Sequence, residues 1–154
     1  MRSKEEMYEL VTKQAESIME GETDTVAIMS NFAALLHHTF QFWWTGFYRV
    51  KDNELLLGPF QGPVACMHIG YGKGVCGTAW KERRSVVVDD VTKFPGHIAC
   101  SPVTRSEIVV PIFRDEEVVA IIDIDSSELA NFNDVDRRCL EELASKLSAK
   151  ISNV

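Results

Sequence analysis

The chain has 154 residues, of which 45% are hydrophobic and 25% charged, values typical of one globular domain. Its formal net charge of -7, with no long run of Lys or Arg, argues against nucleic acid or an anionic membrane as a partner. No apolar stretch approaches the ~20 residues of a membrane helix, and the polar start Met1–Lys4 is unlike a secretory signal. We therefore expect a cytoplasmic protein, in which a disulfide would be transient and catalytic.

Helical spacing of apolar residues predicts three long helices. Two of them form an N-terminal segment over about 4–38, interrupted near Gly21, and the third covers about 134–152. Between them, over about 42–126, lie short segments rich in β-branched and aromatic residues. The turns at 51–53 and 115–117 predict two antiparallel hairpins, 42–50 with 54–58 and 108–113 with 118–125.

Two further short strands are expected at 64–69, which would carry Cys66, and at 85–90, while 59–63 is expected to break regular structure. The pattern predicts an α+β fold with a central antiparallel sheet of about six strands. The N- and C-terminal helices would pack on one side of that sheet. We expect residues 1–154 to form a single domain.

A glycine-rich turn at 70–77 opens into a short predicted helix. Its spacing matches neither the P-loop nor the dinucleotide fingerprint, although Lys73 lies within it. A tight turn is favoured over a nucleotide site, and the free N-terminus of the helix would be able to hold a small anion.

Three carboxylates stand at the ends of two apolar strands. Asp123 and Asp125 are two residues apart, so both side chains leave one face of the strand, together with Val119 and Ile121. Glu107 begins the neighbouring strand and adds a third acid. The strand 118–125 is apolar on both faces and is therefore expected to be buried on both. Its carboxylates would lose hydration and repel one another unless a cation or proton compensates.

Two sources of compensation are open. Arg105 or Arg114 would neutralise the acids as structural ion pairs. Otherwise the cation is the ammonium group of a ligand, held in a pocket walled by Trp44 and Tyr48, whose faces also suit a methyl-sulfur group. In the strand that contains them, alternation places Trp44 and Tyr48 on one face and Trp43 with Phe47 on the other.

The four cysteines form no C-x-x-C pair, and their spacing fits no structural zinc site. His68 and His97 lie near Cys66 and Cys100, which is a weak indication of a metal, and a redox role is favoured. Cys100 follows small or apolar residues in a loop bounded by Pro95-Gly96 and Pro102. Cys139 lies beside the apolar stripe of the last helix and is expected to be a small buried hydrophobe.

The chain resembles the free methionine-(R)-sulfoxide reductases, which are stand-alone GAF-domain enzymes. The resemblance extends from about Trp44 to Asp136. It rests on the segments Trp44-Thr45-Gly46-Phe47-Tyr48, Gly58-Pro59-Phe60-Gln61-Gly62 with Cys66, Gly74-Val75-Cys76-Gly77-Thr78-Ala79, Phe94-Pro95-Gly96-His97-Ile98-Ala99-Cys100, Ser106-Glu107-Ile108-Val109 and Asp123-Ile124-Asp125-Ser126.

The resemblance implies a role for each residue of the site. Cys100 would be the nucleophile that attacks the sulfoxide sulfur, Cys66 the resolving cysteine, and Cys76 an auxiliary one. The acids Glu107, Asp123 and Asp125 would hold the substrate's amino group and the sulfoxide oxygen, and Trp44 and Tyr48 would wall the pocket. Thioredoxin would reduce the disulfide, no metal or other cofactor would be required, and a homodimer would be a common state.

Two other functions remain open from the sequence. A GAF sensor would bind a small ligand without chemistry, and a thiol-based peroxide sensor would oxidise Cys100 without turning over a sulfoxide. His97 would either help to ionise Cys100 as a nearby cation or orient its loop. The acid cluster suits a free amino acid, because a methionine within a protein has no α-ammonium group.

Overall fold

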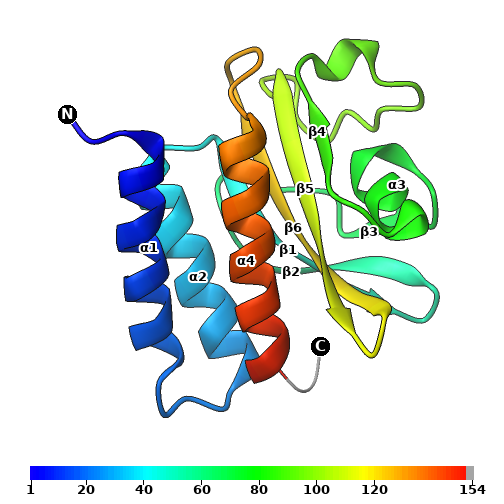
Figure 1. Cartoon of the computed structure of the whole chain (residues 1–154). Helices are drawn as coiled ribbons and strands as arrows, with labels where there is room; N and C mark the ends of the chain where they lie inside the picture. The colour runs from blue at the N-terminus through cyan, green and yellow to red at the C-terminus, as the bar shows by residue number, and fades with distance from the viewer. Residues whose placement is uncertain (152–154) are drawn as a thin grey trace.

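The computed structural model describes residues 1–151. Six strands form one antiparallel sheet in the order β3-β2-β1-β6-β5-β4 (Figure 1). The strands are β1 (Trp44–Lys51), β2 (Glu54–Gln61), β3 (His68–Gly70), β4 (Val86–Val88), β5 (Ser106–Arg114) and β6 (Glu117–Ser126). The helices are α1 (Lys4–Met19), α2 (Thr25–Phe40), α3 (Gly74–Glu82) and α4 (Asp134–Lys150), with one 3-10 turn at Val91–Lys93. The predicted α+β class and the six-stranded antiparallel sheet are confirmed.

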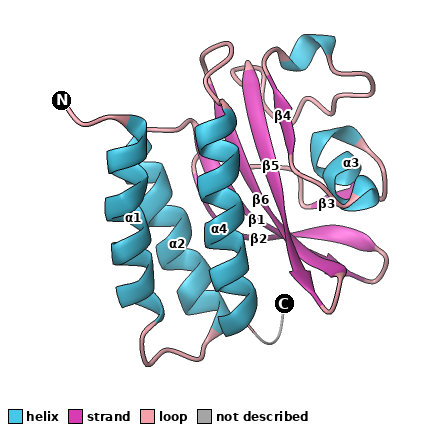
Figure 2. Ribbon diagram, in the orientation of Figure 1, coloured by secondary structure: helices cyan, strands magenta, loops and turns pink. Residues whose placement is uncertain are grey.

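The sheet separates two apolar cores. The helices α1, α2 and α4 cover one face, and α3 lies on the other face together with long loops (Figure 2). On the helical side, fully buried side chains from all three helices pack against Phe47, Ile122 and Ile124 of the sheet. The second core is smaller, and the loops that close it leave room for a pocket.

The three long helices begin where the sequence supplies caps. Ser3 and Asn133 each form a capping box, with Glu6 and Asp136 respectively, and Asp24 accepts from the backbone N–H of Ala27. Within residues 1–151, no helix has both the length and the apolar character needed to cross a membrane.

A β-bulge in β6 changes the predicted alternation. Ile112 pairs with Ala120 but Phe113 pairs with Val118, so Val119 is an extra residue on β6. As a result Val118 packs in the α3-side core and Val119 packs against the helical side. The prediction that Val119 shares a face with the two aspartates is therefore wrong, whereas Ile121 does lie on their side.

Three further expectations about the strands need correction. Residues 59–61 continue β2, because an irregularity in the β1–β2 pairing between Gly46 and Tyr48 accommodates Pro59. Cys66 lies in the loop before β3, which begins only at His68. Trp43 precedes β1 and packs on the same side as Trp44, not with Phe47, since strand alternation does not extend to it.

Candidate active site

The register of three neighbouring strands aligns the acids with an aromatic wall. Glu107 of β5 lies opposite Asp125 of β6, and Asp125 lies opposite Trp44 of β1. Asp123 is two pairs further along, opposite Gly46. All three acids line one pocket on the α3 side of the sheet, as the sequence predicted.

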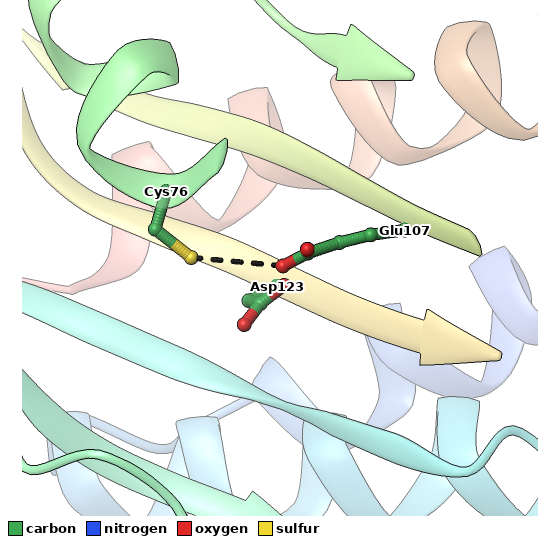
Figure 3. Close-up of side chains that lie close together, drawn as sticks. All are labelled: Cys76, Glu107 and Asp123. Carbon is green, nitrogen blue, oxygen red and sulfur yellow. Dashed lines mark hydrogen bonds between the residues drawn. The ribbon is translucent and has the colours of Figure 1, made fainter. Parts of the chain in front are cut away.

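Cys76 approaches these acids from the first turn of α3. Its thiol donates a hydrogen bond to Oε2 of Glu107 over 3.9 Å, and Figure 3 shows the two side chains and Asp123 pointing toward one another. One ligand atom from each of the three lies within 4.8 Å of the other two. A thiol and two carboxylates so placed could hold a divalent cation as well as an organic one.

Burial controls the protonation of this cluster. Loss of hydration raises the pKa of Glu107 and of Asp125 well above the ordinary value, and the charge of Asp123 raises both further. Burial also raises the pKa of Asp123, although hydrogen bonds from its neighbours oppose the shift. The pKa of the Cys76 thiol is raised by burial and by the same acids. Burial therefore favours the protonated forms of the three carboxyl groups and the thiol form of Cys76.

These acids have no cationic partner within residues 1–151. No salt bridge within residues 1–151 involves any of the three carboxyl groups, and Arg114 instead donates to the backbone carbonyl of Ile151. One oxygen of Asp123 and one of Asp125 are buried without a hydrogen-bond partner. The structure therefore does not show the acids neutralised by Arg105 or Arg114. The ammonium group of a ligand is the better candidate for the missing cation.

The aromatic wall is held by hydrogen bonds to the loop that carries Cys66. The indole N–H of Trp44 donates to the carbonyl of Pro63 over 3.0 Å, and the Tyr48 hydroxyl donates to the carbonyl of Cys66 over 2.8 Å. The two rings lie with centroids 6.0 Å apart. They border a pocket that is partly open to solvent.

Gly46 leaves the space that the Trp44 ring occupies. A Cβ atom at this position would lie 2.4 Å from Cβ of Phe60 and 2.7 Å from Cη2 of Trp44. Both contacts are shorter than van der Waals distances allow, so the position of the indole depends on this glycine.

Cys66 and Cys100 are joined by a disulfide, with Cα atoms 5.7 Å apart, across 34 positions of sequence. Cys100 also lines the pocket that contains the acids. The other two cysteines are free: Cys76 is buried in the pocket, and Cys139 is half-buried on α4, beside the helical core. The sequence did not by itself indicate which cysteines pair, whereas the family resemblance did.

His97 also lines the pocket, and its pKa is lowered by burial, against the opposing influence of Asp123. A neutral imidazole is poorly suited to ionise a neighbouring thiol, which favours a role in orienting the loop. Sequence reasoning did not identify Thr104, which also lines the pocket and which no chemical pattern marked. The first turn of α3 lines the pocket at Gly74 and Val75 without a side-chain cap, as the predicted free helix N-terminus suggested.

Comparison with known proteins identifies the family. The model of the GAF domain matches residues 2–152. The free methionine-R-sulfoxide reductase of Saccharomyces cerevisiae is 43% identical over 151 residues, covering 92% of this chain and 84% of the yeast protein. The enzyme of the same name from Escherichia coli is 39% identical over 146 residues, covering 94% of this chain and 88% of its own length.

A solved structure of similar fold contains a bound substrate. The free methionine-R-sulfoxide reductase of Neisseria meningitidis in complex with its substrate superposes with a TM-score of 0.96, at 47% identity, covering 97% of this chain and 91% of that one. Together with the acid pocket and the cysteine pair beside it, these similarities show that the chain belongs to the GAF-domain family and, within it, to the free methionine-(R)-sulfoxide reductases.

Proposed function

We propose that this chain reduces free L-methionine (R)-sulfoxide to L-methionine by way of a cysteine sulfenic acid and an intramolecular disulfide. One observation carries the proposal: a disulfide-forming cysteine, Cys100, lines a pocket whose buried carboxyl groups have no cation of their own. Neither a ligand sensor nor a peroxide sensor needs both features in one pocket.

The substrate's ammonium group binds among Glu107, Asp123 and Asp125, where it supplies the positive charge that the acids lack. The methyl-sulfur end lies against Trp44 and Tyr48, because aromatic faces interact favourably with polarisable sulfur. The α-carboxylate faces the first turn of α3, whose backbone N–H groups carry partial positive charge and no side-chain cap.

The chemistry transfers one oxygen atom and two electrons. The Cys100 thiolate attacks the sulfoxide sulfur and forms a transient S–S bond to it, while the sulfoxide oxygen takes up a proton. The oxygen then passes to the Cys100 sulfur as the S–O bond and the transient S–S bond break, so methionine leaves and Cys100 becomes a sulfenic acid. The thiol of Cys66 then attacks the sulfenic sulfur, forming the disulfide and releasing the oxygen as water. A proton is needed as the oxygen leaves, and the acid cluster is suited to supply it because burial raises the pKa of its members.

An external dithiol must reduce the disulfide before the next turnover, and the family resemblance implies thioredoxin. Cys76 is the auxiliary cysteine, able to replace Cys66 as the resolving thiol. No cofactor is required, since both electrons come from thiols. We also propose that residues 1–154 act as one domain, as the chain length indicates, and that a homodimer forms, as the resemblance implies. Sedimentation of the purified chain tests the homodimer.

Single-turnover release of methionine tests the proposed roles. Cys100→Ser is expected to release none. Cys66→Ser is expected to release one equivalent and then stall, unless Cys76 resolves the sulfenic acid. Cys139→Ser is the matched control and is expected to turn over like wild type. Continued turnover of the same variants is measured with thioredoxin and its NADPH-coupled reductase as the reductant. The R and S sulfoxides are assayed separately.

Thiol counting before and after sulfoxide is added separates the competing functions. The proposed reductase loses two thiols for each methionine released. A sensor would lose none, and a peroxide sensor would lose thiols to peroxide but not to the sulfoxide. Either of those two results would overturn the proposal.

A further inference from the structure

The surface around the disulfide differs from the rest of the molecule in apolar exposure. Val64 and Met67 flank Cys66 and are 88% and 65% exposed, and Ile98 and Val103 flank Cys100 and are 38% and 39% exposed. Because the disulfide joins the two loops, all four residues lie within three positions of a bonded cysteine. We call these four residues the apolar collar.

The other exposed large hydrophobic side chains within residues 1–151 are scattered over the N-terminus, the helices, β4 and other loops. They are Met1, Leu10, Val26, Tyr71, Val87 and Leu129. Isolated exposed side chains of this kind are normal, whereas a group of them at one place marks an interaction site.

The two segments that carry the collar contain no charged residue. One-quarter of the chain is charged, yet residues 55–67 and 94–104, which contain the collar and both bonded cysteines, include no Asp, Glu, Lys or Arg. Depletion of charge is typical of the centre of a protein interface and not of a solvated loop. A partner that faces these loops must therefore present an apolar, uncharged surface.

We infer that the apolar collar is the docking surface for a protein dithiol whose nucleophilic cysteine is surrounded by apolar residues. The inference rests on the proposed function, because a disulfide formed in each turnover must be reduced from outside. A thiolate of the partner attacks one sulfur of the Cys66–Cys100 bond, forming a mixed disulfide and releasing the other cysteine as a thiolate. The partner's second thiol then breaks the mixed disulfide, so two electrons pass to the enzyme and the partner becomes oxidised.

The size of the collar also suits such a partner. Redox encounters have the smallest interfaces among protein complexes, below about 1,200 Å² of total buried surface. A few apolar side chains around the reacting sulfur can dominate an interface of that size, since a small number of residues carry most of the binding energy.

The test measures reduction of the preformed disulfide, without sulfoxide present, by thioredoxin and by dithiothreitol. Since Val64 and Ile98 also line the pocket, Met67→Lys and Val103→Lys are the chosen variants. Each is expected to lower the second-order rate constant with thioredoxin about tenfold, while the rate with dithiothreitol stays within about twofold of wild type. Val26→Lys and Leu129→Lys make the same change at exposed positions elsewhere and are expected to leave both rates unchanged.

Salt provides a second readout. Docking through an uncharged surface predicts that the thioredoxin rate changes less than about twofold between low and high ionic strength. A steep fall with salt would place docking on a charged surface instead and overturn the inference. Unchanged thioredoxin rates in both collar variants would also overturn the inference, and so would an equal loss of rate with dithiothreitol. Faster reduction by glutathione than by thioredoxin would overturn it as well. Loss of dithiothreitol-driven sulfoxide turnover in wild type would count against the proposed function alone.

Discussion

Tyr48 donates a hydrogen bond to the backbone carbonyl of Cys66 over 2.8 Å, and in this way the wall of the pocket holds one end of the disulfide. The phenol is buried, and its pKa is raised by burial and by the charges of the acid cluster, so it remains a donor over the whole working range of pH. Tyr48 therefore connects the shape of the pocket with the position of the cysteine that is proposed to resolve.

Tyr48→Phe is expected to slow disulfide formation more than it slows release of methionine. Loss of a hydrogen bond of this kind costs about 1 kcal/mol, which corresponds to about fivefold in the resolving step. Rapid quenching with a thiol-alkylating reagent, after one equivalent of sulfoxide, separates the two steps. Tyr71→Phe, which alters an exposed tyrosine, is the control. Equal slowing of both steps would contradict the expected role.

A substrate without an ammonium group is expected to be poor. N-acetyl methionine sulfoxide would leave the buried acids without a cation, and breaking a buried charge pair costs about 3–5 kcal/mol. The value of kcat/KM should therefore fall by at least about two orders of magnitude relative to the free amino acid. Coupled oxidation of NADPH with both substrates measures the ratio. Comparable turnover of the acetylated compound would refute the ammonium site.

The free energy of unfolding is expected to decrease as pH rises above the ordinary carboxyl range. Burial raises the pKa of Glu107, Asp123 and Asp125 in the folded chain, so the folded state binds more protons than the unfolded state. Their contribution to stability is complete below the unfolded pKa of about 4 and is lost as pH rises through the folded values.

Asp125→Asn removes one of these groups and is expected to flatten that dependence, so that the variant gains stability relative to wild type as pH increases. Urea unfolding of reduced protein without substrate, at intervals from acid to alkaline pH, measures it. An exposed acid that has no ion pair, as in Asp115→Asn, provides the control. A parallel pH dependence in wild type and Asp125→Asn would contradict the assignment.

Gly46→Ala is expected to disturb the pocket by moving Trp44. The added Cβ would overlap Phe60 and the indole, and overpacking of this kind costs about 1–3 kcal/mol. A higher KM with a smaller change in kcat is the expected signature, because the wall contacts substrate and does not react. Gly70→Ala is the matched control, since its Cβ would meet only the flexible side chain of Lys73 at 3.2 Å.

Asp136 is buried on the helical side, where it accepts from the Tyr8 hydroxyl over 2.6 Å and from Lys4 Nζ over 2.6 Å. Tyr8→Phe removes one of these bonds and leaves the rest of the network. A loss of about 1–3 kcal/mol in the free energy of unfolding is expected, with unchanged sulfoxide turnover. A loss of activity at full stability would contradict this purely structural role.

Much of the fold follows from periodicity because each long helix and each hairpin has its own local signal. Helical stripes end at recognisable caps, and charged turns separate apolar runs, so α1, α2, α4 and both hairpins agree with the predictions. The gathering of Glu107, Asp123 and Asp125 was also predictable, since strand alternation aligns acids near the point where β6 was expected to end.

The remaining features depend on contacts between distant residues, which no local pattern encodes. The bulge at Val119 is set by pairing with β5, and the strand character of residues 59–61 is set by pairing with β1. The pairing of Cys66 with Cys100 needs two loops to meet across 34 positions, and only the resemblance to a known family supplied it. Trp43 was misplaced because alternation was extended beyond the start of β1.

The unpaired acid cluster has a consequence for how a reaction cycle ends. Methionine differs from its sulfoxide by a single oxygen and keeps the same ammonium group, so carboxyl groups that capture the reactant also retain the product. Release of methionine, and not cleavage of the S–O bond, would then be the rate-limiting step when methionine accumulates. An enzyme built on this pocket would slow as its own product builds up in the surrounding pool.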